Sequence, residues 1–113
     1  MGSTAASGGY FVSLACDKVF ADPATLTGSI GVFGGKLVFK DLLEKLNITV
    51  SSLKMGKNAG LFSMTQDFTA EQQKFFNASL DRVYQDFTNK VAARRGFSAK
   101  QIDALARGRV FTG

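Results

Sequence analysis

The sequence has 113 residues, of which 45% are hydrophobic and 20% are charged, and this composition is typical of a globular protein. Its net charge is +5, but no basic run alternates with aromatic residues, so we predict no nucleic-acid partner. One cysteine and no histidine exclude an internal disulfide, a Ser-His-Asp or Cys-His device completed within the chain, and the usual zinc ligand sets. We expect neither a metal nor a cofactor.

The first informative stretch is residues 3–10, STAASGGY, in which small residues surround Ser7. Residues 11–15 continue as an apolar run, which predicts a short helix from Ser7 to about Cys16, with Cys16 buried in the core. A hydroxyl at the start of that helix lies beside amide groups that have no intrahelical partner, and these amides would stabilise an alkoxide or oxyanion. A plain N-cap serine is the alternative that this local pattern leaves open.

The next elements follow in chain order. Residues 18–21 are predicted to form a short strand, which Pro23 ends because proline has no amide hydrogen to donate. Residues 25–33 are rich in Thr, Ile and Val and predict a strand or an extended loop. Gly34 and Gly35 then indicate a turn.

The middle of the chain predicts a helix, a strand and a loop. Residues 36–46 carry an apolar helical stripe, with Asn47 suited to the C-terminal cap. Residues 48–54 alternate as a strand does, and residues 55–68 lack a regular period.

The last third predicts two helices and a strand. Thr69 with Gln72 has the form of a capping box, which opens a helix over residues 70–95 that ends near Gly96. One face of this helix is apolar and is expected to pack in the core; its members are Phe76, Leu80, Val83, Phe87 and Val91. A second capping pattern over residues 98–101 opens a short helix that stops at Gly108, and a strand begins at Val110. Alternating strands and helices indicate an α/β layered fold.

Three motifs occur in one order along the chain: AASGGY at residues 5–10, ADPATLTGSIGV at residues 21–32 and GRVFTG at residues 108–113. Together they resemble the signal peptide peptidase A (protease IV) family of bacterial and plastid serine peptidases. The resemblance implies the Clp-protease/crotonase-like spiral of ββα units and assembly into ring-like homo-oligomers. It also implies that residues 1–113 are one partial peptidase domain, similar to the C-terminal half of the tandem-domain members.

The resemblance further implies a Ser-Lys dyad in place of a histidine-based triad. Ser7 stands at the position of the nucleophile, and the amide of Gly8 would supply one oxyanion-hole donor. Ser29 matches a family serine that orients the lysine base. A neutral hydroxyl can hold an uncharged amine without raising its pKa, whereas a carboxylate would raise it. A serine that caps local backbone between two glycines is the alternative for Ser29.

The position of the lysine base departs from the family pattern. Single-domain members carry a Gly-x-x-Lys sequence after the strand, but here Ala59 stands three residues after Gly56. Lys57 lies two residues earlier and would point in another direction. Either the base comes from a part of the protein outside this chain, which we favour, or Lys57 serves through a shorter loop. If neither is the base, Lys54 and Lys57 are expected to be solvated surface charges beside a substrate groove.

The expected activity is hydrolysis of cleaved signal peptides and other hydrophobic peptides through an acyl-enzyme, with the isolated chain inactive. A non-catalytic assembly domain of the same fold is the main alternative, and another Ser-Lys peptidase of the same clan is a weaker one. The resemblance implies a bacterial cell envelope or plastid membrane location. No stretch reaches the roughly 18 apolar residues of a spanning helix, so we expect membrane association only through parts not in this chain.

Overall fold

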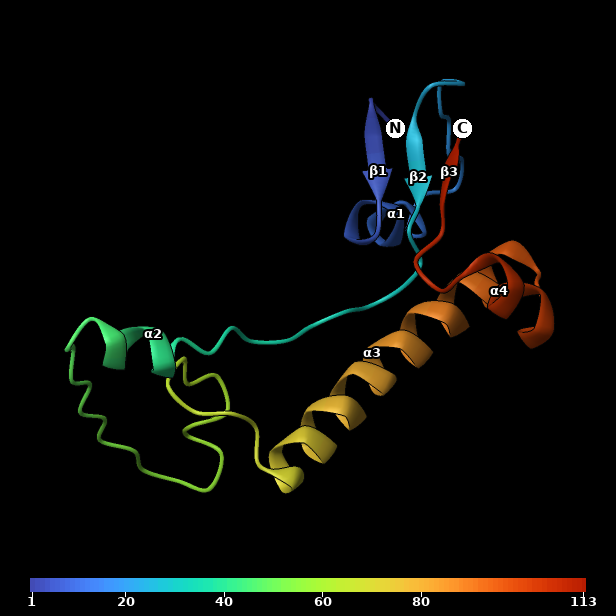
Figure 1. Cartoon of the computed structure of the whole chain (residues 1–113). Helices are drawn as coiled ribbons and strands as arrows, with labels where there is room; N and C mark the ends of the chain where they lie inside the picture. Colours follow the sequence, from blue (N-terminus) through green and yellow to red (C-terminus); the bar gives the residue numbers. More distant parts are fainter. The chain divides into compact units, whose positions relative to one another are not determined.

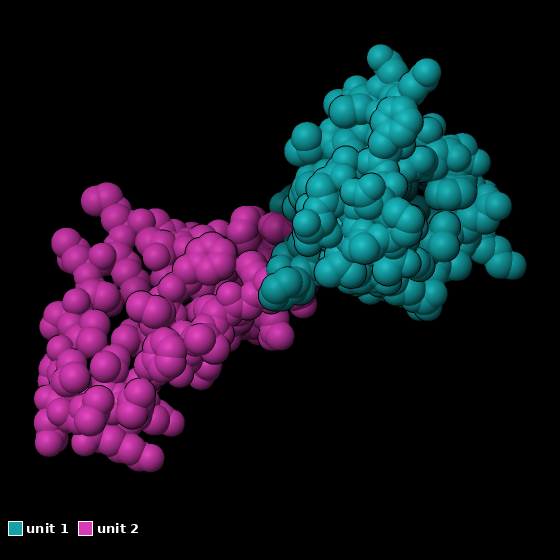
Figure 2. Space-filling model, turned by 90° about the horizontal axis from the view of Figure 1, so that it is seen from above, with its two compact units in different colours: residues 1–33, 80–113 teal, residues 34–79 magenta.

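The computed structural model describes all 113 residues and divides them into two compact units (Figure 2). Unit 1 comprises residues 1–33 and 80–113, and unit 2 comprises residues 34–79. The elements in chain order are β1 (Thr4–Ala6), α1 (Gly8–Ser13), β2 (Leu26–Gly28), α2 (Lys40–Lys45), α3 (Ala70–Arg95), α4 (Ala99–Leu105) and β3 (Val110–Thr112) (Figure 1). The chain therefore has the mixture of strands and helices expected of an α/β protein.

The three strands form one sheet in unit 1, in the order β1-β2-β3 (Figure 1). Strand β1 is parallel to β2, and β2 is antiparallel to β3. Gly28 in β2 pairs with Ala6 on one side and Val110 on the other. It has φ +80°, and a Cβ there would lie 2.7 Å from Cδ2 of Phe111, so glycine is required on both conformational and steric grounds.

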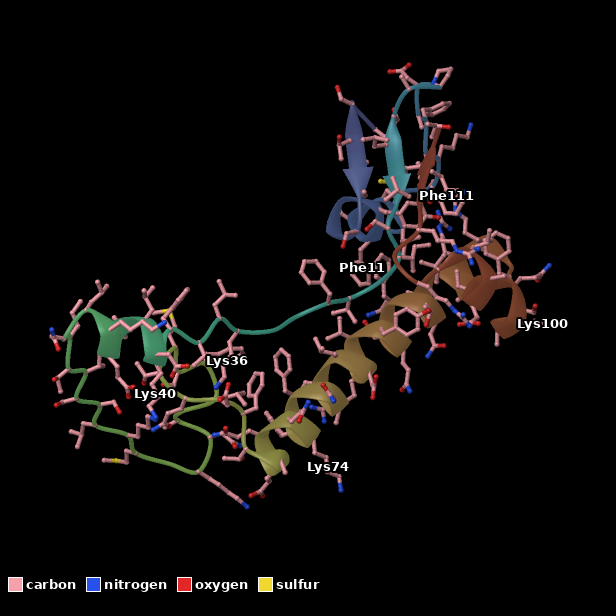
Figure 3. All side chains as sticks on the ribbon, viewed as in Figure 1. Phe11, Lys36, Lys40, Lys74, Lys100 and Phe111 are labelled. Carbon is pink, nitrogen blue, oxygen red and sulfur yellow. The ribbon has the colours of Figure 1, made fainter.

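The hydrophobic core lies in unit 1 and is assembled from both ends of the chain. Its buried members are Tyr10, Ile30, Phe87, Val91, Ile102 and Ala106. The ring of Phe11, labelled in Figure 3, meets the ring of Phe87 edge to face, with centroids 5.1 Å apart. Arg95 Nε donates to the Tyr10 hydroxyl over 3.1 Å. The end of α3 is thereby fixed to α1, the helix that follows Ser7.

Helices α3 and α4 confirm most of the expectations for the C-terminal third. Helix α3 has the bounds expected, and both capping boxes form, with the amide of Gln72 donating to the Thr69 hydroxyl and that of Gln101 to the Ser98 hydroxyl. The apolar face is only partly a core face. Phe87 and Val91 are buried, but Val83 is 54% exposed, and its assignment to the core was wrong.

Unit 2 contains the largest departures from the expected elements. A helix was predicted over residues 36–46, and only Lys40–Lys45 of this stretch is helical. The strand predicted over residues 48–54 is absent. A strand needs a neighbour to accept and donate its backbone hydrogen bonds, and none is paired with this segment. Asn47 has φ +53°, as expected of a helix C-terminus. Leu61 is the buried hydrophobic residue of this unit.

Two expectations for the N-terminal third also need correction. Residues 18–21 form no strand. Residues 25–33, by contrast, form a strand over Leu26–Gly28 and no regular structure on either side of it, as expected of a strand or an extended loop. Cys16 is exposed rather than buried. Helix α1 ends at Ser13, so the chain has left the helical face that packs on the core before it reaches Cys16.

Candidate active site

Ser7 and Ser29 each stand directly after a strand, and the two strands are parallel neighbours. Ser7 follows β1 and Ser29 follows β2. The carboxyl ends of parallel strands lie at the same edge of a sheet, which brings the two backbones together. The amide of Ser7 donates to the carbonyl oxygen of Gly28 over 2.9 Å.

The backbone of Ser7 has a rare conformation, with φ +50° and ψ −116°. This combination is costly for a residue with a Cβ, and such strain persists where the surrounding structure enforces it, often at functional sites. Ser7 occupies the N-cap position of α1, but its side chain makes no capping hydrogen bond. The structure therefore lacks the interaction that defines a plain capping serine, and the Ser7 hydroxyl remains available for other chemistry.

The first turn of α1 provides backbone donors next to Ser7. The first amides of a helix have no intrahelical acceptor, and Gly8 is the first residue of α1. A Cβ built on Gly8 would meet no atom within 4 Å. The approach to the Gly8 amide is therefore open on the side where a side chain would otherwise stand.

Ser29 is held by the turn that precedes β3. Its amide donates to the carbonyl oxygen of Arg109 over 2.6 Å, and the Gly108 amide donates to the carbonyl oxygen of Ile30 over 3.0 Å. A Cβ on Gly31 would lie 2.8 Å from the Gly108 nitrogen, so the two segments touch through their backbones. Ser29 itself has φ +49°. Residues of the second and third motifs are thus in direct contact.

Ser7 and Ser29 line the same cavity of unit 1, which has a volume of about 1020 Å³. Its walls come from α1, the segment after β2, one face of α3 and the turn before β3. The remaining lining residues are Gly8, Phe11, Gly31, Val32, Phe33, Leu80, Asp81, Val83, Tyr84, Asp86, Phe87, Arg107 and Gly108. An apolar cavity with a few polar groups is the usual form of a ligand site.

Two polar side chains of this wall were not foreseen. The hydroxyl of Tyr84 is buried and has no hydrogen-bond partner. Arg107 is ion-paired with Asp103, its Nε lying 3.3 Å from Oδ1, and this contact raises the pKa of Arg107 and lowers the pKa of Asp103. The helical spacing of Leu80, Val83 and Phe87 predicted a buried face. All three line the cavity, and of these Phe87 is also buried in the core. The helical period alone does not distinguish a core residue from a residue that lines a cavity.

The lysines near the expected base position belong to unit 2. Lys57 Nζ lies 2.6 Å from Oε1 of Glu71, and both side chains are more than two-thirds exposed. The hydrogen bond and charge of Glu71 raise the pKa of Lys57, which is the opposite of what a neutral general base needs. Lys36, labelled in Figure 3, places its ammonium 4.3 Å from the centre of the Phe68 ring, and that nitrogen is buried with no hydrogen-bond partner.

Comparison with known proteins identifies the family. The model of peptidase family S49 matches residues 1–113, the whole chain. The chain belongs to peptidase family S49. Among its relatives, an Enterococcus faecium protein named for the signal peptide peptidase SppA is 38% identical over 111 residues, which are 98% of this chain and 32% of that protein. "Protease 4" of Salmonella typhi is 36% identical over 113 residues, or 100% of this chain and 18% of that protein. "Serine protease SPPA, chloroplastic" of Arabidopsis thaliana is 34% identical over 114 residues, or 100% of this chain and 17% of that protein.

The S49 chain therefore spans about a third or less of the length of these three relatives. The resemblance stated from the three motifs is confirmed at the level of the family. The names of the Salmonella typhi and Arabidopsis thaliana relatives describe proteases, and the Arabidopsis name specifies a serine protease. None of the helices is long and apolar enough to span a membrane.

Proposed function

We propose that this S49 chain is the nucleophile-bearing part of a larger Ser-Lys endopeptidase of the signal peptide peptidase A type. The observation that carries the proposal is the geometry of Ser7. This serine follows a strand, has a strained backbone, makes no capping hydrogen bond and shares a cavity with Ser29. That combination is the form of a nucleophile held on a sharp strand-to-helix turn.

In the proposed reaction, Oγ of Ser7 attacks the carbonyl carbon of the peptide bond. The hydroxyl proton passes to a neutral lysine amine and then to the leaving nitrogen, which frees the amine product. The Gly8 amide donates to the oxyanion of the tetrahedral intermediate. Water, activated by the same lysine, then hydrolyses the acyl-enzyme. Ser29 orients the lysine through its hydroxyl.

The lysine base is proposed to come from a part of the protein outside this chain. Support comes from Ala59 at the expected position and from the exposed, ion-paired state of Lys57. The other proposed properties rest on the family resemblance. They are the Clp-protease/crotonase-like spiral, a ring-like homo-oligomer, cleaved signal peptides and hydrophobic peptides as substrates, and a location at the bacterial envelope or a plastid membrane.

Labelling of the full-length protein with a serine-directed phosphonate tests the nucleophile. Ser7→Ala should abolish labelling. Ser13→Ala is the matched control, because Ser13 lies on the same helix and its hydroxyl donates to the Tyr10 carbonyl oxygen over 2.7 Å. Loss of labelling in Ser7→Ala with full labelling in Ser13→Ala supports the proposal, and equal labelling of both variants refutes it.

A non-catalytic assembly domain of the same fold is the second candidate, favoured by Ala59 alone. The two candidates differ in the wild-type protein. An assembly domain would take no phosphonate label and would hydrolyse no peptide, whereas a peptidase would do both.

A further inference from the structure

Three charged residues line the Ser7 cavity: Asp81, Asp86 and Arg107. Two of them are already neutralised by a neighbour. Asp86 Oδ2 lies 2.5 Å from Nζ of Lys90, one turn further along α3. Arg107 is paired with Asp103, one turn earlier in the chain.

Asp81 is the charge that remains. It makes no ion pair and no side-chain hydrogen bond, and it is exposed on the cavity face of α3. Because Lys90 neutralises Asp86 and Asp103 neutralises Arg107, the carboxylate of Asp81 is the one uncompensated charge in the lining of the cavity. A peptide that enters the cavity meets this carboxylate as the dominant fixed charge of the wall.

The cavity that Asp81 lines also has exposed apolar side chains. Val83 is 54% exposed and Phe33 is 97% exposed, and both belong to the same lining. An occupant that covers these side chains removes water from the region of the carboxylate, and an opposite charge then interacts more strongly than it would in open solvent. The fitting ligand group is a cation on a flexible apolar stem, which is the chemistry of a lysine or arginine side chain.

We propose that Asp81 is a specificity-determining residue, which binds a lysine or arginine side chain of a peptide lying in the Ser7 cavity. This inference rests on the proposed function, because it takes the occupant to be a peptide. It adds a preference for a basic residue adjacent to apolar ones in that peptide.

The experiment compares peptides that differ at a single position, Lys, Gln or Glu, within one apolar background. In the full-length protein we expect kcat/KM for the best-placed Lys peptide to exceed that of the Gln peptide about three- to fivefold, the range of a partly exposed ion pair. Asp81→Asn should bring that ratio close to one, and D81K should favour the Glu peptide. Asp67→Asn is the matched control, since it removes the same charge from an exposed position in unit 2 and should keep the ratio.

A binding measurement separates this inference from the proposed function. Fluorescence anisotropy of the same peptides on Ser7→Ala protein reports recognition without hydrolysis. The Lys peptide should bind more tightly than the Gln peptide, and the difference should disappear in the Ser7→Ala, Asp81→Asn double variant and shrink in 1 M salt. Equal binding of Lys and Gln peptides at every position, with Asp81 present, overturns the inference. Hydrolysis that persists in Ser7→Ala overturns the nucleophile assignment instead.

Discussion

The two units of the chain differ in how far they bury their hydrophobic residues. Unit 1 contains the whole sheet and all the buried hydrophobic residues except Leu61. In unit 2, Leu53 and Met55 are fully or almost fully exposed, at 104% and 92%. The difference does not lie in the residue types, because both units are rich in Leu, Val and Phe.

The difference lies in which partners each segment finds. Strands β1, β2 and β3 come from distant parts of the chain and satisfy one another's backbone groups. Residues 48–54 have the alternation of a strand but no neighbouring strand in unit 2. A sequence pattern thus states a preference, and a partner decides whether the strand forms.

The largest expected difference between the units concerns two phenylalanines on α3. Phe87 is 6% exposed and belongs to the core of unit 1, whereas Phe75 is 46% exposed and belongs to unit 2. Phe87→Ala should lower the free energy of unfolding by about 3–5 kcal/mol, because it leaves a cavity in a packed core. Phe75→Ala should cost less than about 1 kcal/mol. Urea unfolding followed by circular dichroism measures both, and equal losses would show that the two helix segments are packed alike.

Two glycines of positive φ give the next contrast. A Cβ on Gly28, in unit 1, would clash with the Phe111 ring at 2.7 Å and approach the Arg109 carbonyl oxygen at 3.0 Å. A Cβ on Gly56, in unit 2, would meet no atom within 4 Å, although its φ is +97°. Both Gly28→Ala and Gly56→Ala should strain the backbone, because alanine disfavours a positive φ. Gly28→Ala should lower the free energy of unfolding by about 1–3 kcal/mol more than Gly56→Ala, because its Cβ also overpacks against Phe111. Thermal unfolding of Gly28→Ala and Gly56→Ala measures this difference in stability. Equal destabilisation by the two substitutions would mean that Phe111 of β3 does not pack against Gly28 of β2.

Hydrogen exchange tests whether residues 48–54 are unpaired. The amide of Ser7 is bonded to Gly28 and that of Leu26 to Ser3, while residues 49–54 donate no backbone hydrogen bond. The sheet amides should exchange at least roughly a hundredfold more slowly than those of residues 49–54. Amide exchange read by mass spectrometry or NMR supplies the measurement. Comparable protection in the full-length protein would show that the segment pairs with chain outside these residues.

The features that sequence reasoning predicted well are local ones. The capping boxes at Thr69 and Ser98, the bounds of α3 and the positive φ of Asn47 depend on interactions within a few residues. The motifs also indicate Ser7 and Ser29, because a family pattern preserves their order along the chain.

The features that sequence reasoning missed depend on distant contacts. Cys16 is exposed because α1 ends early, and Val83 faces a cavity rather than a core. The turn at Arg107 and Gly108 meets the segment after β2 through backbone atoms, for which side-chain periodicity gives no signal. The unpaired charge of Asp81 becomes evident only when the partners of Asp86 and Arg107 are known.

The smallest expected effect concerns catalysis and the lysine of unit 2. A general base must be neutral to accept a proton, and burial among apolar groups is the usual way to lower a lysine pKa toward roughly 7–8. Lys57 is exposed, and its bond to Glu71 raises its pKa instead. Because the pKa of Lys57 is higher in the folded protein than in the unfolded chain, the ion pair with Glu71 stabilises the fold fully at pH values below the pKa of Lys57 in the unfolded chain. This contribution is lost as the pH rises through the pKa of Lys57 in the folded protein. Because both groups are exposed, salt should weaken it further.

Lys57→Met in the full-length protein should therefore leave peptidase activity on an unstructured hydrophobic substrate within about tenfold of wild type, or about 1.4 kcal/mol in barrier height. Glu71→Gln is the matched control, because it breaks the same ion pair and leaves the lysine in place. If Lys57 only forms a surface pair, the two variants should behave alike. If Lys57 is the base, Lys57→Met should lose activity by roughly a thousandfold while Glu71→Gln retains it. That result, with circular dichroism showing an intact fold, would show that Lys57 is the base and that the base belongs to this chain.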